Sequence, residues 1–456
     1  MIKKLIILIF ILTQPTLCYS ALQADAQWEV RTTGNNLNGS CYDEGGAGND
    51  YSQQDAAQLT LTDAATSGVG VTTLTSATGG FTSAMADNCI YLASGTNGTV
   101  GYYEITVFTD TNTVTLDRAP DDAVGGLSGG NVKVGGGAAD YVQIQGHTVT
   151  SNTVWIKAGT YTQLALNTAT RNDWRGYLTT HADKPTGTDR PLIDCDSVTS
   201  VGLTCDITSS TFRHIRVANC TTDGIQRSNV TCPMANMKSS GNTDDGYDDI
   251  GDRNNQCFRC EFNNNGGEGV EVLSAATSSL LDLAGSYLHD NSSNGIESGG
   301  QGAFLFSVAF ANAQDGVEET AHCVNSISHA NTGASTDGFG DISANASAIF
   351  NCIAKDNGRY GFQGSALAIF DYNGYHGNST AGLNGVVAGE NDLTADPLFT
   401  DAANGDFTLQ ASSTYIGAGF PGSIFAGITG NYKVNIGPDQ DDNTVASGGA
   451  SSHTFS

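Results

Sequence analysis

Positive charge is scarce in this sequence. Its 456 residues include 19 Lys and Arg against 47 Asp and Glu, which gives a formal net charge of −28. Proteins that bind nucleic acids neutralise phosphates with a local surplus of Lys and Arg. The composition offers no such surplus, so it disfavours a nucleic-acid partner.

Charged residues of either sign are also few. They make up 14% of the chain, well below the roughly 25% usual for soluble domains. Helix surfaces are commonly built from Glu, Lys and Arg, so this shortage argues against a mainly helical protein. Hydrophobic residues make up 39%, which is enough for a core and excludes wholesale disorder.

Long apolar runs are missing beyond the N-terminus. Lys3 and Lys4 precede an apolar run from Leu5 to Leu12, and a small-x-small site follows at Ala24-Asp25-Ala26. The run is too short to span a bilayer, and the layout is that of a secretory signal peptide. We therefore expect residues 1–26 to be removed. The mature chain should be secreted, in an extracellular or periplasmic location, without a transmembrane segment.

Ten of the eleven Cys remain after loss of Cys18, and export would permit disulfides. Buried free thiols are the alternative, because Cys packs well in a core. The pair Cys257 and Cys260 has metal-ligand spacing, but no second such pair or His cluster accompanies it. The sequence disfavours zinc and leaves disulfides and buried thiols open.

A repeat with a period near 22 residues fills the segment 219–384. Each unit holds a Gly followed by an apolar residue: Gly224-Ile225, Gly246-Tyr247, Gly269-Val270, Gly295-Ile296, Gly316-Val317, Gly338-Phe339, Gly361-Phe362 and Gly382-Leu383. Six units have an Asn four positions before the Gly, namely Asn242, Asn265, Asn291, Asn312, Asn357 and Asn378. Cys220 and Ala334 hold that position in the other two units.

This period accommodates three short strands and their turns. The Gly is expected to supply a turn conformation with positive φ, and the apolar residue after it to point inward. Asn side chains stacked from coil to coil would satisfy the buried turn amides. Leucine-rich repeats have a similar period, but their Leu-x-x-Leu-x-Leu frame is absent. The pattern predicts a parallel β-solenoid with a structural Asn ladder.

Three further segments resemble parts of one family of parallel β-solenoid proteins. Trp28–Gly39 (WEVRTTGNNLNG) resembles an opening strand and turn, and Val154–Thr162 (VWIKAGTYT) resembles a first coil. The motifs DPLF, NGDFTLQ, GAG and NIGPDQ within Asp396–Gln440 resemble closing coils. The chain thereby resembles the right-handed parallel β-helix family of pectate lyases, polygalacturonases and phage tailspikes. The resemblance implies an all-β, right-handed parallel β-helix, a fold that carries many unrelated activities.

Short strand patterns within residues 51–135 interrupt the solenoid pattern. They predict an inserted or N-terminal β-rich domain, which would shield the open end of the solenoid or bind a ligand. The expected division is a signal peptide (1–26), an N-terminal strand or cap (27–50), the β-rich domain (51–135), the β-helix (136–440) and a disordered tail (441–456).

Two acidic rows flank the repeated Gly. One position before it stand Asp223, Asp245, Glu268, Asn294, Asp315 and Asp337. Two positions after it stand Gln226, Asp248, Glu271, Glu297, Glu318 and Gly340. Strand alternation turns the second set outward, and neighbouring coils lie about 4.8 Å apart. The sequence thus predicts a row of carboxylates from Asp248 to Glu318 on one face.

Three interpretations of this row remain open. It could be a solvated face, or a calcium site that includes Asp248 and Glu271. It could also be catalytic, with one protonated carboxyl as general acid and another as base or nucleophile. The candidate catalytic residues are then Glu271, Glu297, Glu318 and Asp248, and the candidate substrate-binding residues are Asp245, Glu268 and Tyr360.

The enzymes of the resembled family can be compared with this chain. Asn242-Thr243-Asp244 and Asp248-Asp249 imitate two polygalacturonase segments, but the Gly-His-Gly and Arg-Ile-Lys segments are missing. So acidic a chain would also repel polyuronates, which disfavours a calcium-dependent lyase. We expect a protein that binds polysaccharide at a cell or virion surface without turnover. The alternative is a polysaccharide-degrading enzyme, preferably a glycoside hydrolase, with no cofactor except calcium at the acidic row.

Overall fold

The computed structural model describes residues 26–438 apart from 123, 163–165, 168–170, 206–209, 229, 252–254, 273–280, 300–301, 321, 343–347, 366–368 and 421–434. All but the last residue of the expected signal peptide lie outside the described residues, as does the expected tail at 441–456. The described chain is almost entirely β. Its one α-helix is the short α1 (Val142–Gln145).

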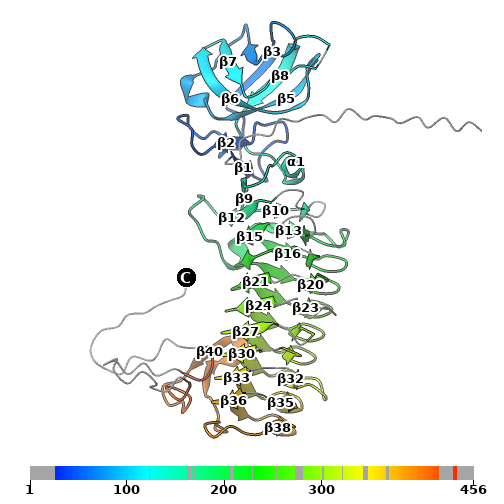
Figure 1. Cartoon of the computed structure of the whole chain (residues 1–456), viewed down its shortest axis with the longest axis vertical. Coiled ribbons are helices and arrows are strands. Elements are labelled where there is room, and N and C mark those ends of the chain that lie inside the picture. The colour runs from blue at the N-terminus through cyan, green and yellow to red at the C-terminus, as the bar shows by residue number, and fades with distance from the viewer. Residues whose placement is uncertain are drawn as a thin grey trace, which may run out of the picture.

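Most strands belong to three parallel sheets. Each sheet runs along the axis of a solenoid, and its strands come from successive coils (Figure 1). The first sheet contains, in spatial order, β2 (Cys41–Asp43), β1 (Ala26–Val30), β9 (Thr153–Lys157), β12 (Asp173–Tyr177), β15 (Thr211–Arg213), β18 (Met234–Ala235), β21 (Asn255–Phe258), β24 (Leu281–Ala284), β27 (Ala303–Leu305), β30 (His322–Val324), β33 (Ala348–Phe350) and β36 (Ile369–Asp371). Only β2 runs antiparallel to its neighbour.

The other two parallel sheets have ten strands each. The second sheet contains β10 (Thr160–Tyr161), β13 (Leu192–Asp194), β16 (Arg216–Ala218), β19 (Lys238–Ser240), β22 (Glu261–Asn263), β25 (Tyr287–His289), β28 (Val308–Phe310), β31 (Ile327–His329), β34 (Ile353–Lys355) and β37 (Gly374–His376). The third contains β11 (Leu166–Asn167), β14 (Leu203–Cys205), β17 (Ile225–Arg227), β20 (Tyr247–Asp249), β23 (Val270–Val272), β26 (Ile296–Glu297), β29 (Val317–Glu318), β32 (Phe339–Ile342), β35 (Tyr360–Gly364) and β38 (Ala381–Asn384).

Each coil therefore contributes one strand to each sheet, which confirms the predicted parallel β-helix. The apolar residue after each repeated Gly starts or lies near the start of a strand of the third sheet and points into the core. Ile225, Tyr247 and Val270 are paired in register and are at most 1% exposed. The core is a continuous column of such side chains, so each coil is stabilised mainly by its neighbours.

The repeated Gly has a different purpose from the one predicted, because its φ is not positive in any of the eight units. A Cβ on Gly246 would lie 2.5 Å from the carbonyl oxygen of Gly269. The Gly is required for close packing of successive coils. Positive φ occurs instead just before each ladder Asn, for example at Asn264 (55°) and Asp290 (56°).

The predicted Asn ladder is present. Each side-chain amide donates to the side-chain oxygen of the next coil at 2.9–3.1 Å, from Asn242 through Asn265, Asn291, Asn312, Asn331 and Asn357 to Asn378. The expected break at Ala334 is wrong, since Asn331 fills that position from seven residues before its Gly. The turn in this coil is three residues longer than in the others, which hid Asn331 from a fixed spacing.

Both open alternatives for the cysteines occur. Four disulfides join Cys41 to Cys89, Cys195 to Cys220, Cys205 to Cys232 and Cys257 to Cys260. Cys323 and Cys352 are free and buried in the core. The Cys257 and Cys260 thiols are thus joined to each other.

A separate six-stranded antiparallel sheet lies beyond the N-terminal end of the solenoid (Figure 1). Its order is β3 (Leu59–Ala64), β8 (Ser128–Val134), β5 (Cys89–Thr96), β6 (Gly101–Asp110), β7 (Thr113–Leu116) and β4 (Thr73–Thr75). It has its own core, which includes Ile90, Ile105 and Val132. The expected β-rich unit is therefore observed, while its shielding or binding role stays a prediction.

The motifs expected to form closing coils do something else. β39 (Phe399–Asp401) and β40 (Asp406–Leu409) pair antiparallel with each other. The side chains of Phe399 and Phe407 pack with Val308, Ile327 and Ile353 of the second sheet. The chain thus turns back after β38, and its hairpin packs on the outside of that sheet. Figure 1 shows β40 beside the lower coils of the solenoid. None of the helices in the described ranges has the length and apolar character that crossing a bilayer requires.

Candidate functional site

The predicted carboxylate row exists on the outer side of the third sheet. Asp248 pairs in register with Glu271, Glu271 with Glu297, and Glu297 with Glu318. We call these four residues the acidic face. Glu271, Glu297 and Glu318 are partly exposed, whereas Asp248 is only 8% exposed. The row is therefore half-buried, and its first member is nearly covered.

Five of the six polar residues one position before the Gly, all except Glu268, have a structural role that the sequence did not suggest. Asp245 Oδ1 accepts a hydrogen bond from the backbone N–H of Glu268 at 2.7 Å. Asp315 Oδ1 accepts one from the N–H of Asp337 at 2.6 Å. The same contact recurs from Asp223 to Asp245, from Asn294 to Asp315 and from Asp337 to Tyr360. We call Asp223, Asp245, Glu268, Asn294, Asp315 and Asp337 the capping row.

The capping row and the acidic face meet at one point. Asp245, Glu268 and Glu271 each offer an oxygen, and these oxygens lie within 4.8 Å of one another. Three carboxylates this close repel one another unless they share protons or hold a cation. Oxygen-only ligands suit Ca²⁺. The group contains Glu271 of the expected calcium pair, but it has Asp245 and Glu268 in place of Asp248.

Burial and mutual repulsion change the acidity of these groups. Burial raises the pKa of Glu271 to about 7, helped by the charges of Glu268 and Asp248. Burial also raises the pKa of Glu318 to about 7, helped by Glu297. The pKa of Asp245 is raised as well, because it is buried and hydrogen-bonded to Glu268. At neutral pH the site therefore holds both carboxylic acids and carboxylates.

Side-chain amides separate the carboxylates. Gln226 Nε2 donates to Asp248 Oδ2 at 3.2 Å, and the other oxygen, Asp248 Oδ1, is buried without a hydrogen-bond partner among the described residues. Asn294 Nδ2 donates to Glu297 at 3.3 Å and to Glu318 at 2.5 Å. These amides fix the orientation of the carboxylates across neighbouring coils.

One expected participant, Tyr360, lies elsewhere. Tyr360 is on β35, four strands along the third sheet from β23, which carries Glu271. Its ring lies 5.1 Å from the Arg359 guanidinium carbon, and Arg359 binds Asp337 at 2.5 Å. Tyr360 therefore marks the far end of the capping row and does not join Glu271.

The polygalacturonase-like pair Asp248 and Asp249 is split between two environments. The side chain of Asp249 is completely buried and forms an ion pair with Arg227, which is also completely buried. Such a pair is engaged with its partner and closed to substrate. The imitation of a catalytic Asp-Asp pair is thus only sequential.

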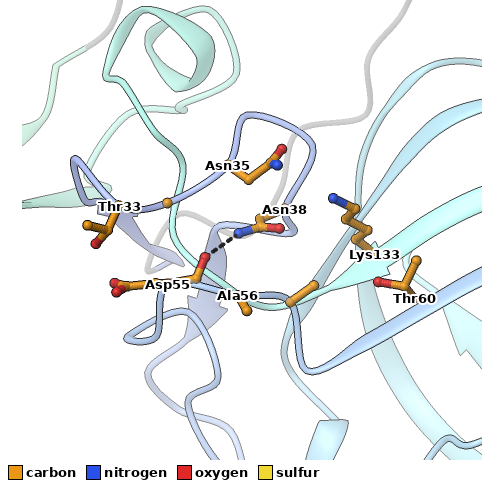
Figure 2. Close-up of a pocket in the computed structure, with 9 residues that line it drawn as sticks. Thr33, Asn35, Asn38, Asp55, Ala56, Thr60 and Lys133 are labelled. Atoms are coloured by element: carbon orange, nitrogen blue, oxygen red, sulfur yellow. Dashed lines mark hydrogen bonds between the residues drawn. The ribbon is translucent and has the colours of Figure 1, made fainter.

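Sequence reasoning missed a polar pocket near the start of the solenoid. It has a volume of about 340 Å³, and its lining includes Thr33, Asn35, Asn38, Asp55, Thr60 and Lys133. Figure 2 shows Lys133 of β8 facing the turn that carries Asn35 and Asn38. The pocket lies between the N-terminal segment and the six-stranded sheet, away from the acidic face. Its residues are far apart in the sequence, so no sequence motif predicted the pocket.

Comparison with known proteins gives distant structural similarities only. No protein-family model and no curated protein matches the sequence. A pectate lyase, Pel9A, is 13% identical with a TM-score of 0.47 and covers 67% of this chain and 91% of its own. The tailspike protein gp49 from Pseudomonas phage LKA1 is 11% identical with a TM-score of 0.22, and the match covers 75% of this chain and 64% of the tailspike chain. These values carry no argument about activity. The three stacked sheets define the class: the chain is a parallel β-helix protein.

Proposed function

We propose that this chain is an exported protein whose acidic face binds a polysaccharide along the solenoid axis. The observation that carries the proposal is the register of Asp248, Glu271, Glu297 and Glu318 on adjacent strands. Carboxylates repeated every ~4.8 Å can accept hydrogen bonds from successive hydroxyl groups of a sugar chain. The net charge of −28 favours an uncharged glycan, or an acidic one bridged by Ca²⁺.

Two features support export to a cell or virion surface. The N-terminal 26 residues have the layout of a signal peptide. Four disulfides join eight of the ten remaining cysteines. Structural disulfides persist in oxidising compartments such as the periplasm and the extracellular space.

Glycoside hydrolysis is a second candidate, favoured by the raised pKa of Glu271 and Glu318. Adjacent coils separate carboxyls by ~4.8 Å, close to the ~5–5.5 Å of retaining glycosidases. Protonated Glu271 would donate its proton to the glycosidic oxygen as that bond breaks. The Glu297 carboxylate would bond to the anomeric carbon, and water would then release the sugar while Glu271 takes back a proton.

A polysaccharide panel tests both candidates. The chain from Gln27 is incubated with neutral and acidic polysaccharides, with and without Ca²⁺, and bound polymer, new reducing ends and absorbance of unsaturated uronates are measured. Glu271→Gln and Glu297→Gln should weaken binding, and should abolish any new reducing ends. Glu390→Gln, at an exposed residue outside the face, is the matched control. Bound polymer without new reducing ends supports the binding protein. Absorbance of unsaturated uronates contradicts the hydrolase, and the absence of any bound polymer contradicts both candidates.

A further inference from the structure

A small group of basic residues lies on and beside the second sheet, away from the acidic face. Arg216 lies on β16 and points outward from the second sheet, paired in register with Lys238. Its Nε donates to the carbonyl oxygen of Arg190 at 3.3 Å. His214 lies beside them, with Nδ1 3.3 Å from the carbonyl oxygen of Pro185. Burial lowers the pKa of His214, and the positive charges of Arg190 and Lys184 lower it further.

Arg190 is the unusual member of this group. It is only 6% exposed, and its Nε and Nη1 have no hydrogen-bond partner among the described residues. Burial and the charge of Arg216 lower the pKa of its guanidinium. A buried guanidinium without a counter-charge is costly, so proteins almost always pair it.

The carboxylates nearby do not supply that pair. Glu261 attracts Arg190, but its Oε1 is held by Lys238 Nζ at 2.6 Å. Asp189 and Asp194 attract Arg216 without forming an ion pair in the described part of the chain. The second nearby cation, Arg216, therefore adds positive charge beside Arg190 instead of relieving it.

We propose that Arg190, just before β13, and Arg216, at the start of β16, form an oxyanion-binding site at the second sheet. Guanidinium groups bind sulfate, phosphate and carboxylate through charge-assisted hydrogen bonds, and one such group would satisfy the open nitrogens of Arg190. The anion is either a free inorganic ion or a charged substituent of a glycan. This site is independent of the polysaccharide proposal, because the acidic face belongs to the third sheet and repels anions.

Titration with sulfate tests the site on the whole mature chain. Thermal unfolding and calorimetry are followed in sodium sulfate and in sodium chloride at matched ionic strength. We expect a saturable sulfate effect on wild type that weakens at least tenfold in Arg190→Gln and Arg216→Gln. Arg171→Gln, at an exposed residue, should bind sulfate like wild type. A wild-type response equal in the two salts, or an unchanged response in Arg190→Gln, overturns the proposal.

Two further measurements keep the result independent of folding. Arg190→Gln removes a buried unpaired charge, so without sulfate it should unfold at no lower temperature than wild type. Crystals soaked in selenate should show an anomalous peak ~2.7–3.2 Å from Arg190 or Arg216 nitrogens, and a peak only elsewhere contradicts the site. A heparin-derived tetrasaccharide that displaces sulfate, while its desulfated form does not, identifies a glycan substituent; failure of both assigns a free ion.

Discussion

The side-chain amide of Asn312 donates a hydrogen bond to the side-chain oxygen of Asn331 at 3.1 Å. Both residues are fully buried, and Asn312 in turn accepts from the side-chain and backbone amides of Asn291. This contact links two coils whose turns differ in length. It therefore keeps the ladder continuous where the repeat itself is irregular.

Removing one rung of this ladder should destabilise the solenoid. In Asn312→Ala, buried donors of Asn291 lose their acceptor, at about 1–3 kcal/mol for each unsatisfied group. We expect a clear fall in the unfolding temperature measured by circular dichroism. Asn384→Ala, at an exposed position of β38, should unfold like wild type. Equal unfolding temperatures of the two variants would contradict stabilisation of the solenoid by the Asn ladder.

The cysteine pattern predicts a simple labelling result. In the chain from Gln27, a maleimide should not label the native protein, because burial raises the pKa of Cys323 to about 12 and Cys352 is equally inaccessible. Unfolding without reductant should expose these two thiols, and unfolding with reductant all ten. Mass spectrometry counts the labels. Four or more labels before reduction would contradict the four disulfides.

The carboxyl groups of the site predict an unusual pH dependence. Asp223, with a pKa raised to about 6, and Glu318 and Asp315, with pKa values raised to about 7, stay protonated in the folded state at pH values where the unfolded chain ionises. Their stabilisation is complete below the unfolded pKa, near 4, and is lost as pH rises to about 7. Buried His329, with its lowered pKa, acts in the opposite direction below about pH 6.5.

A single variant isolates the carboxyl contribution. Glu318→Gln removes one titrating group and leaves His329 unchanged. Between pH 5 and 7.5, wild type should lose more stability than Glu318→Gln, as followed by the unfolding temperature. Parallel pH profiles would show that Glu318 titrates as it does in the unfolded chain. Added Ca²⁺ should raise the unfolding temperature of both proteins at pH 7.5 if the cluster of Asp245, Glu268 and Glu271 holds the ion, because Glu318 lies outside that cluster.

The C-terminal hairpin should detach when its anchor is removed. Phe407 is 5% exposed and packs its ring 5.1 Å from that of Phe310 and 5.3 Å from that of Phe399. Phe407→Ala removes an anchor of a kind typically worth about 3–5 kcal/mol. We expect faster proteolysis within residues 390–420 with an intact solenoid. Phe258→Ala, at a 47% exposed residue, is the control, and an identical cleavage rate would contradict the anchoring.

The fold could be predicted because a solenoid converts sequence spacing directly into spatial neighbours. The inward position of Tyr247 and the outward row through Glu271 follow from the repeat and strand alternation alone. Details that depend on turn length or close approach could not be read this way. Asn331 lies outside the fixed spacing. The Gly at position 246 is required because a Cβ there would lie 2.5 Å from the carbonyl oxygen of Gly269, and not because of its φ.

The site was predicted in part for the same reason. The register of the acidic face came from the repeat, but burial of Asp248 and the capping contact of Asp245 depend on how neighbouring turns stack. Arg190 and its unsatisfied guanidinium lie outside the repeat, in a segment that no periodic pattern describes. Contacts that are formed through irregular turns cannot be predicted from the spacing of residues in the sequence.

Hydrogen–deuterium exchange with a polysaccharide that binds in the panel tests whether the acidic face is the binding site, because it locates the bound ligand. If the acidic face binds the polysaccharide, we expect protection of peptides carrying Asp248, Glu271, Glu297 and Glu318, with little change in the second sheet around Tyr287. The protection should shrink in Glu271→Gln and persist in Glu390→Gln. Protection confined to the six-stranded sheet, or to the pocket beside Lys133, would contradict binding at the acidic face and place the binding site at the N-terminal end.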